Sequence, residues 1–142
     1  ERGLLLRSTD KGATWKRLGD IYAGSFFGVM SLPSKTLLAF GMRGNAFRST
    51  DLGQTWTQCR IPTGTSLFSG ASLGDARVLL AGAGNAILVS EDDGVSFAAV
   101  SPSGRATYAA LLPISANEWL TASDAGLLVK RPEAVAVTGD AS

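Results

Sequence analysis

A short motif recurs three times in the chain at a constant interval of 41 residues. Its copies begin at Ser8, Ser49 and Ser90. They read Ser-Thr-Asp-Lys-Gly-Ala-Thr-Trp, Ser-Thr-Asp-Leu-Gly-Gln-Thr-Trp and Ser-Glu-Asp-Asp-Gly-Val-Ser-Phe. A fixed period of this length indicates that the chain repeats one supersecondary unit. We therefore expect residues that lie 41 positions apart to occupy equivalent places in successive units.

The same register extends beyond the motif without gaps. One position holds leucine in three copies, at Leu38, Leu79 and Leu120. A second position holds glycine or asparagine in four copies, at Gly3, Gly44, Asn85 and Gly126. Glycine and asparagine are the residues that best tolerate a positive φ, so we expect one left-handed turn geometry at all four sites. A fourth motif would begin at residue 131, where the sequence Arg-Pro-Glu-Ala no longer matches.

Each period divides into four short apolar runs, separated by residues that favour turns. In the second copy the runs cover residues 26–32, 36–41, 45–49 and 55–59. Runs of about five residues between Gly, Pro, Asp and Ser are typical of strands, and no stretch holds the 3.6-residue period of a helix. Four strands in about 40 residues are typical of one blade of a β-propeller. The sequence therefore predicts an all-β propeller of four-stranded antiparallel blades.

The predicted strands make about 3.5 blades. Residues 1–20 hold the third and fourth strands of one blade, whole blades follow in 21–61, 62–102 and 103–139, and 140–142 form a tail. An open row of blades leaves an uncovered edge or face at each end, and propellers cover these by closing into a ring. The chain is therefore expected to be about half of a six- to eight-bladed ring, or to self-associate. The first interpretation is favoured because the chain begins in mid-blade.

The motif Ser-x-Asp-x-Gly-x-Thr-Trp resembles the Asp-box, or BNR repeat, of sialidases, other glycoside hydrolases and the non-catalytic Ycf48-like propellers. The resemblance implies a turn between the third and fourth strands, away from the binding face. We expect the aspartate to accept backbone N–H bonds, the glycine to adopt a positive φ, and the aromatic residue to pack between blades. These structural residues are Asp10, Gly12, Trp15, Asp51, Gly53, Trp56, Asp92, Gly94 and Phe97.

Composition excludes several kinds of site. The chain has no histidine, and Cys59 is its only cysteine, so imidazole chemistry, an internal disulfide and a multi-cysteine metal site are ruled out. Cys59 shares its repeat position with Leu18 and Val100 and is expected in the core. Thirteen basic against twelve acidic residues argue against a general nucleic-acid binder. No apolar run reaches the length of a membrane span, and no cofactor is predicted.

The motif raises the question of glycosidase activity, which needs two carboxyl groups about 5–10 Å apart. Sialidases also use three arginines and a tyrosine nucleophile, yet neither Tyr22 nor Tyr108 has a matching context. No evident pair exists among the acidic residues outside the motif, which include Asp20, Asp75, Glu118, Asp124 and Glu133. We therefore expect no enzymatic activity. A fragment of an Asp-box glycoside hydrolase, sialidase- or xyloglucanase-like, is the alternative.

The short, regular repeats are most similar to the Ycf48-like family of photosystem II assembly and stability factors. The resemblance implies a protein-binding scaffold for a membrane-complex subunit, located outside the cytoplasm in the periplasm or thylakoid lumen. Propellers bind partners on the face that carries the blade connectors and the turns between second and third strands. On that face we predict Tyr22, Arg43, Arg60 and Arg105 as partner-binding residues, the arginines forming a basic patch. Ordinary solvated surface is the alternative for these side chains.

Overall fold

The computed structural model describes residues 2–100 and 104–131, and it contains strands with a single 3-10 turn. The first sheet consists of β1 (Leu6–Arg7) and β2 (Lys16–Arg17). The second consists of β3 (Phe26–Ser31), β4 (Leu37–Gly41), β5 (Ala46–Ser49) and β6 (Thr57–Gln58). The third consists of β7 (Leu67–Gly74), β8 (Arg77–Gly82), β9 (Ile87–Ser90) and β10 (Ala98–Ala99). The fourth consists of β11 (Tyr108–Ser115), β12 (Glu118–Ser123) and β13 (Gly126–Lys130).

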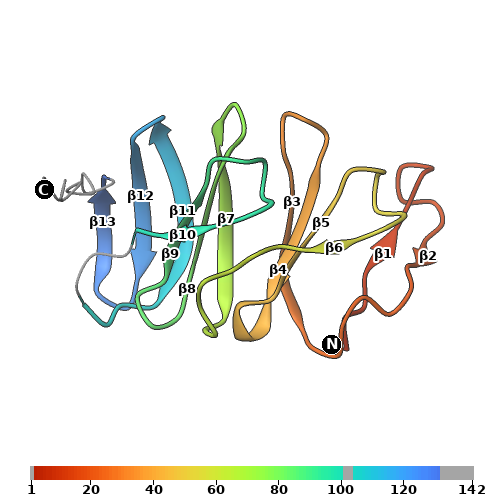
Figure 1. Ribbon diagram of the computed structural model, residues 1–142, viewed down its shortest axis with the longest axis horizontal. Coiled ribbons are helices and arrows are strands. Elements are labelled where there is room, and N and C mark those ends of the chain that lie inside the picture. The colour runs from red at the N-terminus through yellow and green to blue at the C-terminus, as the bar shows by residue number, and fades with distance from the viewer. Residues whose placement is uncertain (1, 101–103, 132–142) are drawn as a thin grey trace, which may run out of the picture.

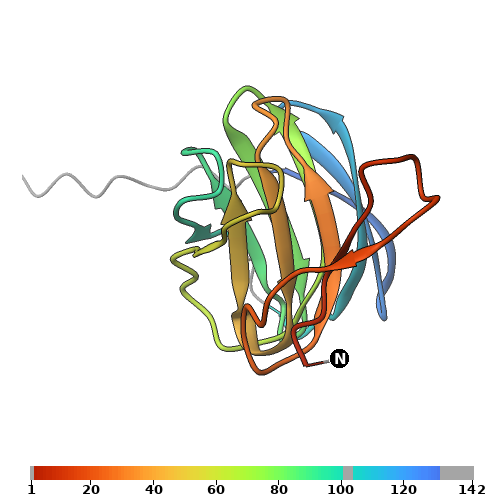
Figure 2. The ribbon, with the colours of Figure 1, turned by 90° about the vertical axis from the view of Figure 1, so that its right-hand side faces the viewer.

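The four sheets are the blades of a β-propeller. Within each sheet, neighbouring strands are antiparallel and follow one another in sequence order. The sheets stand side by side in chain order, and the first strand of the third blade, β7, contacts the first strands of both neighbours, β3 and β11 (Figure 1). Turned by 90°, the sheets overlap one behind another (Figure 2). The predicted all-β propeller fold is confirmed.

Two predicted segments at the end of the chain cannot be compared with the structure. The fourth strand expected near residues 135–138 and the tail 140–142 lie outside the described residues. The one helical segment, η1 (Met42–Gly44), is a single turn between β4 and β5. Among the described residues, no helix has the length and apolar character that crossing a membrane requires.

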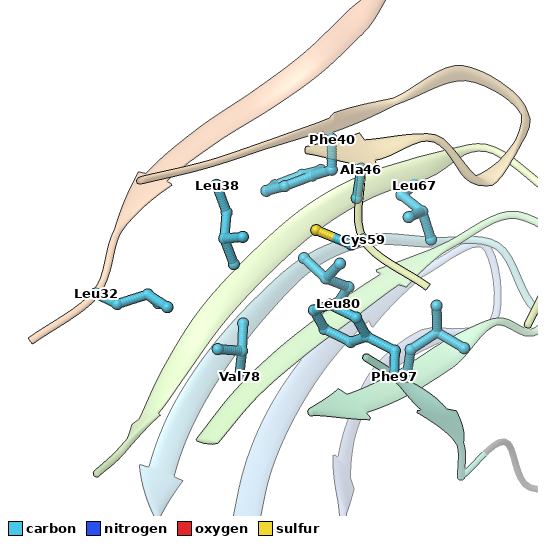
Figure 3. Packing of buried hydrophobic residues seen from close by; sticks show 10 residues of the cluster. Leu32, Leu38, Phe40, Ala46, Cys59, Leu67, Val78, Leu80 and Phe97 are labelled. Carbon is cyan, nitrogen blue, oxygen red and sulfur yellow. The ribbon is translucent and has the colours of Figure 1, made fainter. Parts of the chain in front are cut away.

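The hydrophobic core lies between the blades. One buried cluster joins Leu38, Phe40 and Cys59 of the second blade to Val78, Leu80 and Phe97 of the third, among others (Figure 3). A second cluster joins the third and fourth blades through Leu79, Ala81, Ile87, Tyr108 and Trp119. Successive residues of a strand point to opposite faces, so β8 supplies both clusters and the third blade is apolar on both sides.

Cys59 occupies a core position, as its repeat position predicts, and Trp119 is also buried in the core. Burial raises the pKa of the Cys59 thiol to about 12, so the reactive thiolate is strongly disfavoured. Trp119 packs against the third blade, and its indole Nε1 has no hydrogen-bond partner among the described residues. Both side chains therefore serve packing.

The gapless register is wrong by one residue in the last repeat. Leu38 pairs with Arg48 in the second blade, whereas the equivalent Leu120 pairs with Val129 in the fourth. Its turn is one residue shorter, because Gly126 already pairs with Ser123, and Gly126 is the one left-handed residue there. In the other copies two successive residues have positive φ, namely Arg2 and Gly3, Arg43 and Gly44, and Gly84 and Asn85. The predicted positive φ is nevertheless confirmed at all four sites, with values of 66°, 70°, 63° and 99°, but a common turn geometry holds only in the first three copies.

The motif residues form a hydrogen-bonded turn between the third and fourth strands of each of the first three blades. In the second copy, Ser49 Oγ accepts from the Gly53 N–H at 2.8 Å, and Asp51 accepts from the N–H and hydroxyl of Thr55 at 2.9 and 2.6 Å. The same bonds surround Asp10 and Asp92. The bonds from Thr14 and Thr55 lower the pKa of Asp10 and of Asp51 to about 2. The carboxylates are thus occupied in holding their turns.

The aromatic residue that closes the motif is buried to very different degrees in the three copies. Phe97 is 7% exposed between the second and third blades, Trp56 is half-buried, and Trp15 is 62% exposed. The prediction that this aromatic residue packs between blades is therefore confirmed for Phe97 and wrong for Trp15. Trp15 lies on the outer face of the first blade, which no described residue covers, and its indole donates to the Gly12 carbonyl at 3.1 Å.

A charged residue in the third motif links two blades. Asp93 accepts hydrogen bonds from Ser34 Oγ at 2.7 Å, from Thr36 Oγ1 at 2.5 Å and from Arg48 Nη2 at 3.0 Å, all in the second blade. The Arg48 Nε also donates to the Asp93 carbonyl at 3.2 Å. Both charged side chains are largely buried. We call this set of contacts the Asp93 clamp.

Candidate functional site

One end of the blades carries the connectors together with the turns between second and third strands, as predicted (Figure 1). The first residue of each such turn donates its N–H to the connector that precedes the blade. Met42 donates to the Ser25 carbonyl at 2.9 Å, Ala83 to Ser66 at 2.9 Å, and Asp124 to Thr107 at 3.3 Å. We call this end the connector face. Because these bonds fix each connector against its own blade, side chains there stand on a rigid base.

Gly44 shows why small residues recur at this face. It has φ of 70°, and a Cβ added to it would overlap the carbonyl oxygen of Thr63 in the next connector. Gly3 stands in the same relation to the Tyr22 carbonyl. Asn85 occupies the equivalent position in the third blade, where its side chain accepts a hydrogen bond from the Tyr108 hydroxyl at 2.9 Å. The position is therefore used either for close approach of the next connector or for a side-chain contact with the first strand of the next blade.

Replacing Gly44 with alanine should lower the free energy of unfolding by about 2 kcal/mol, because the new Cβ adds backbone strain and displaces the connector. Gly64, which has open space around its Cα, is the matched control and should tolerate alanine with a change of less than about 0.5 kcal/mol. Urea denaturation followed by tryptophan fluorescence measures both. Equal losses in the two variants would contradict this explanation.

Tyr22, predicted to bind a partner, is mainly a packing residue of the first connector. Its ring centroid lies 4.9 Å from that of Phe26 and 5.3 Å from that of Phe47. Its hydroxyl donates to the Ser25 carbonyl at 2.6 Å, and burial raises the pKa of the phenol. The half-buried Tyr22 also lines a hollow with Arg2, Arg17 and Asp20.

The three predicted arginines lie in different surroundings. Arg43 is exposed at the β4–β5 turn of the connector face, with a left-handed φ of 56°. Arg60 follows β6 and its backbone pairs with the third motif turn, through its N–H to Val95 at 3.0 Å and its carbonyl to Phe97 at 2.9 Å. Its charge also helps to lower the pKa of Asp92, against the effect of burial. Arg60 therefore lies beside the Asp92 turn on the outer edge of the blades.

Arg105 belongs to a hollow of about 440 Å³ on the connector face, between the third and fourth blades. The hollow is lined mainly by Asn85, Arg105, Tyr108, Asp124 and Lys130. Neither Arg43 nor Arg60 contributes to it. The structure thus places Arg105 beside Lys130 and not beside the two other predicted arginines. No feature of the motif predicts that Lys130 lies there.

The base of this hollow is fixed by hydrogen bonds. Tyr108 is buried and donates to Asn85 Oδ1, the Asn85 N–H donates to the Ala106 carbonyl at 2.7 Å, and the Thr107 N–H donates to Asp124 Oδ1 at 2.9 Å. Burial, followed by the nearby Asp124 charge, raises the pKa of the Tyr108 phenol, which stays protonated as a donor. Arg105 is exposed at the opening and Lys130 is half-buried. A rigid polar base with two cations suits an anionic or carbonyl-rich ligand such as a polypeptide segment.

The acidic residues offer no evident catalytic pair within the described parts of the chain. The carboxyl groups whose pKa departs from the ordinary value, those of Asp10, Asp51, Asp92 and Asp93, all have it lowered. A glycosidase needs a carboxylic acid whose pKa is raised. Asp20 pairs with Arg17 and Glu118 pairs with Arg131. No cluster of described residues has the composition of a metal site.

No protein-family model and no curated protein matches the sequence. Solved structures match the fold closely. Ycf48 bound to a D1 peptide aligns with a TM-score of 0.75 over 93% of this chain at 15% identity. An ancestral GH74 enzyme aligns with 0.76 over 92% at 17% identity, and the GH74 xyloglucanase from Xanthomonas campestris with 0.71 over 91% at 18% identity. The chain spans 44%, 20% and 25% of these three structures, respectively. The resemblance to Ycf48 is therefore supported at the level of the β-propeller fold.

Proposed function

We propose that the chain is part of a non-catalytic propeller that binds protein on its connector face, as a Ycf48-like assembly or stability factor for a membrane complex. The observation that carries the proposal is the hollow between the third and fourth blades, with its fixed polar base and the cations Arg105 and Lys130. Such a site recognises carboxylates and backbone carbonyls without needing any reacting group. A solved neighbour, Ycf48 bound to a D1 peptide, adds support because that propeller binds a peptide.

A fragment of a glycoside hydrolase is the second candidate, because two structural neighbours are GH74 enzymes. The lowered pKa of the motif carboxyl groups favours the non-catalytic, protein-binding propeller. Motif carboxylates with lowered pKa are poor general acids, and the hydrogen bonds that lower it already occupy them. We further propose, on the family resemblance alone, a location outside the cytoplasm in the periplasm or thylakoid lumen. Fractionation of the source cells tests that location.

The double variant Arg105→Glu/Lys130→Glu should reduce partner capture at least tenfold, because it reverses both charges at the opening of the hollow. The measurement is capture of membrane-complex subunits from detergent-solubilised membranes by the immobilised chain, with subunits identified by mass spectrometry. The matched control is Lys16→Glu/Lys35→Glu, which makes the same change in net charge at exposed positions outside the hollow. Equal capture by both double variants would contradict the assignment of this site. Hydrolysis of xyloglucan or of a fluorogenic sialoside by the unmodified chain would favour the hydrolase candidate.

A further inference from the structure

A second hollow, of about 490 Å³, lies beside β1 and β2 of the first blade and reaches the motif turn of the second. Its lining contains three cationic side chains, and no acidic one lies among the described residues that form it. Arg7, Lys16 and Arg17 line it with Thr9, Thr14 and Gln54, among others. The chain as a whole has a net charge of only +1, so positive charge is concentrated here. We call this site the cationic hollow.

Two of the cations point toward the second blade together. Arg7 and Lys16 lie directly opposite each other in the antiparallel pair of β1 and β2, so their side chains share one face of the blade. The residue 41 positions after Arg7 is Arg48, whose side chain points toward the next blade and binds Asp93 there. By the same geometry, Arg7 and Lys16 point toward the second blade, where Gln54 lines the other side of the hollow.

These two cations have no carboxylate partner among the described residues. The residue of the second blade that is equivalent to Asp93 is Leu52, which cannot neutralise Arg7 as Asp93 neutralises Arg48. The ion pairs of the described residues involve neither Arg7 nor Lys16. Because Arg7 is half-buried, water screens its charge incompletely, so it attracts an anion more strongly than an exposed arginine does.

The cationic hollow is open because a backbone contact that closes the equivalent space elsewhere is not made here. Between the second and third blades, the Arg60 N–H donates to the Val95 carbonyl at 3.0 Å. The equivalent residues between the first and second blades are Gly19 and Gln54. No backbone hydrogen bond joins this described pair, and both residues line the hollow instead. The opening is therefore specific to the first two blades and is not a general feature of the repeat.

We propose that the cationic hollow binds the phosphate group of a phosphomonoester. The Arg7 guanidinium can donate two parallel N–H bonds to a tetrahedral oxyanion, the Lys16 ammonium adds a compact charge, and the Thr9 hydroxyl adds a donor. A phosphomonoester carries nearly two negative charges at neutral pH, which match the two cations that have no carboxylate partner. The site is new relative to the proposed partner site, because none of its lining residues belongs to the hollow between the third and fourth blades.

Isothermal titration calorimetry of the chain with glycerol 3-phosphate, at low ionic strength and about pH 8, should show one binding site. Arg7→Gln/Lys16→Gln removes both charges from the hollow and should weaken binding about tenfold or more. Lys35→Gln/Arg43→Gln is the matched control, because it removes the same charge from exposed positions outside the hollow, and it should bind like the unmodified chain. No binding by the unmodified chain, or equal weakening in both double variants, would overturn the proposal.

Amide chemical shifts of the unmodified chain locate the ligand without relying on any variant. Titration with glycerol 3-phosphate should move the signals of Thr9, Lys16 and Gln54 and leave that of Arg105 in place. Shifts confined to Arg105 and its neighbours would place the phosphate in the other hollow and overturn the proposal. Acetate, which carries one charge, should bind about tenfold more weakly, and equal affinity for the two anions would show unselective attraction, which also contradicts a phosphate site.

Vesicles distinguish a membrane headgroup from a soluble phosphomonoester. Co-sedimentation with phosphatidate vesicles, but not with phosphatidylcholine vesicles, identifies the phosphate of a lipid. Binding of glycerol 3-phosphate without co-sedimentation identifies a soluble ligand. Partner capture by the hollow between the third and fourth blades should not change when glycerol 3-phosphate is added, so failure of one proposal leaves the other standing.

Discussion

Replacing Phe97 with alanine should lower the free energy of unfolding by about 3–4 kcal/mol, whereas Trp15→Ala should lower it by less than about 1 kcal/mol. The two residues hold the same motif position, 82 residues apart, and their turns make the same hydrogen bonds. They differ in their neighbours. Phe97 is buried against Leu38, Cys59 and other residues of the second blade, and its removal leaves a cavity there. Trp15 is largely in water, so its removal leaves none.

Chemical denaturation at a protein concentration where the chain is monomeric measures both losses. The difference between the two losses is more informative than either loss alone, since a contribution common to shortening any aromatic residue cancels in the difference. Similar losses at both positions would show that Trp15 is covered in solution by part of the same chain.

The repeat predicts local structure well because it depends on backbone conformation. The left-handed residues Gly3, Gly44, Asn85 and Gly126 are recognisable since few residue types tolerate a positive φ. Strand positions also follow, because Leu38 and Leu79 each precede a turn by the same distance. The shorter turn of the fourth blade, in which Gly126 already pairs with Ser123, is not visible in the sequence, because a glycine still stands at the expected position.

Contacts between blades are less predictable, because the period gives no information about what lies opposite a residue. Asp93 stands at a variable motif position, occupied by Lys11 and Leu52 in the other copies. Its bonds to Arg48 and Thr36 depend on which sides of two blades meet, so sequence reasoning missed the clamp. Arg60 was assigned to the connector face from its place after a fourth strand, whereas its backbone pairs with the next motif turn. Lys130 lies in the hollow because β13 places it there, and no local sequence pattern predicts that position.

The Asp93 clamp leads to the second large effect. Asp93→Ala should lower the free energy of unfolding by about 3 kcal/mol at neutral pH, because it leaves Arg48 as a largely buried charge without its carboxylate. Ser34 and Thr36 lose their acceptor as well. The matched control is Glu91→Ala, which removes an exposed acidic residue from the same turn and should change stability by less than about 0.5 kcal/mol. Equal losses would assign the effect to net charge rather than to the clamp.

The pH dependence of this loss identifies the carboxylate as its cause. Burial opposes ionisation of Asp93, but the hydrogen bonds from Thr36, Ser34 and Arg48 outweigh it and lower the pKa below the ordinary value of 3.8. A group with a lowered folded pKa stabilises the fold fully above its unfolded pKa and loses that contribution as the pH falls through the folded pKa. The difference between unmodified chain and Asp93→Ala should therefore be constant above about pH 5 and shrink below about pH 4. A difference that stays constant down to pH 2.5 would mean that packing of the side chain, and not its charge, joins the two blades.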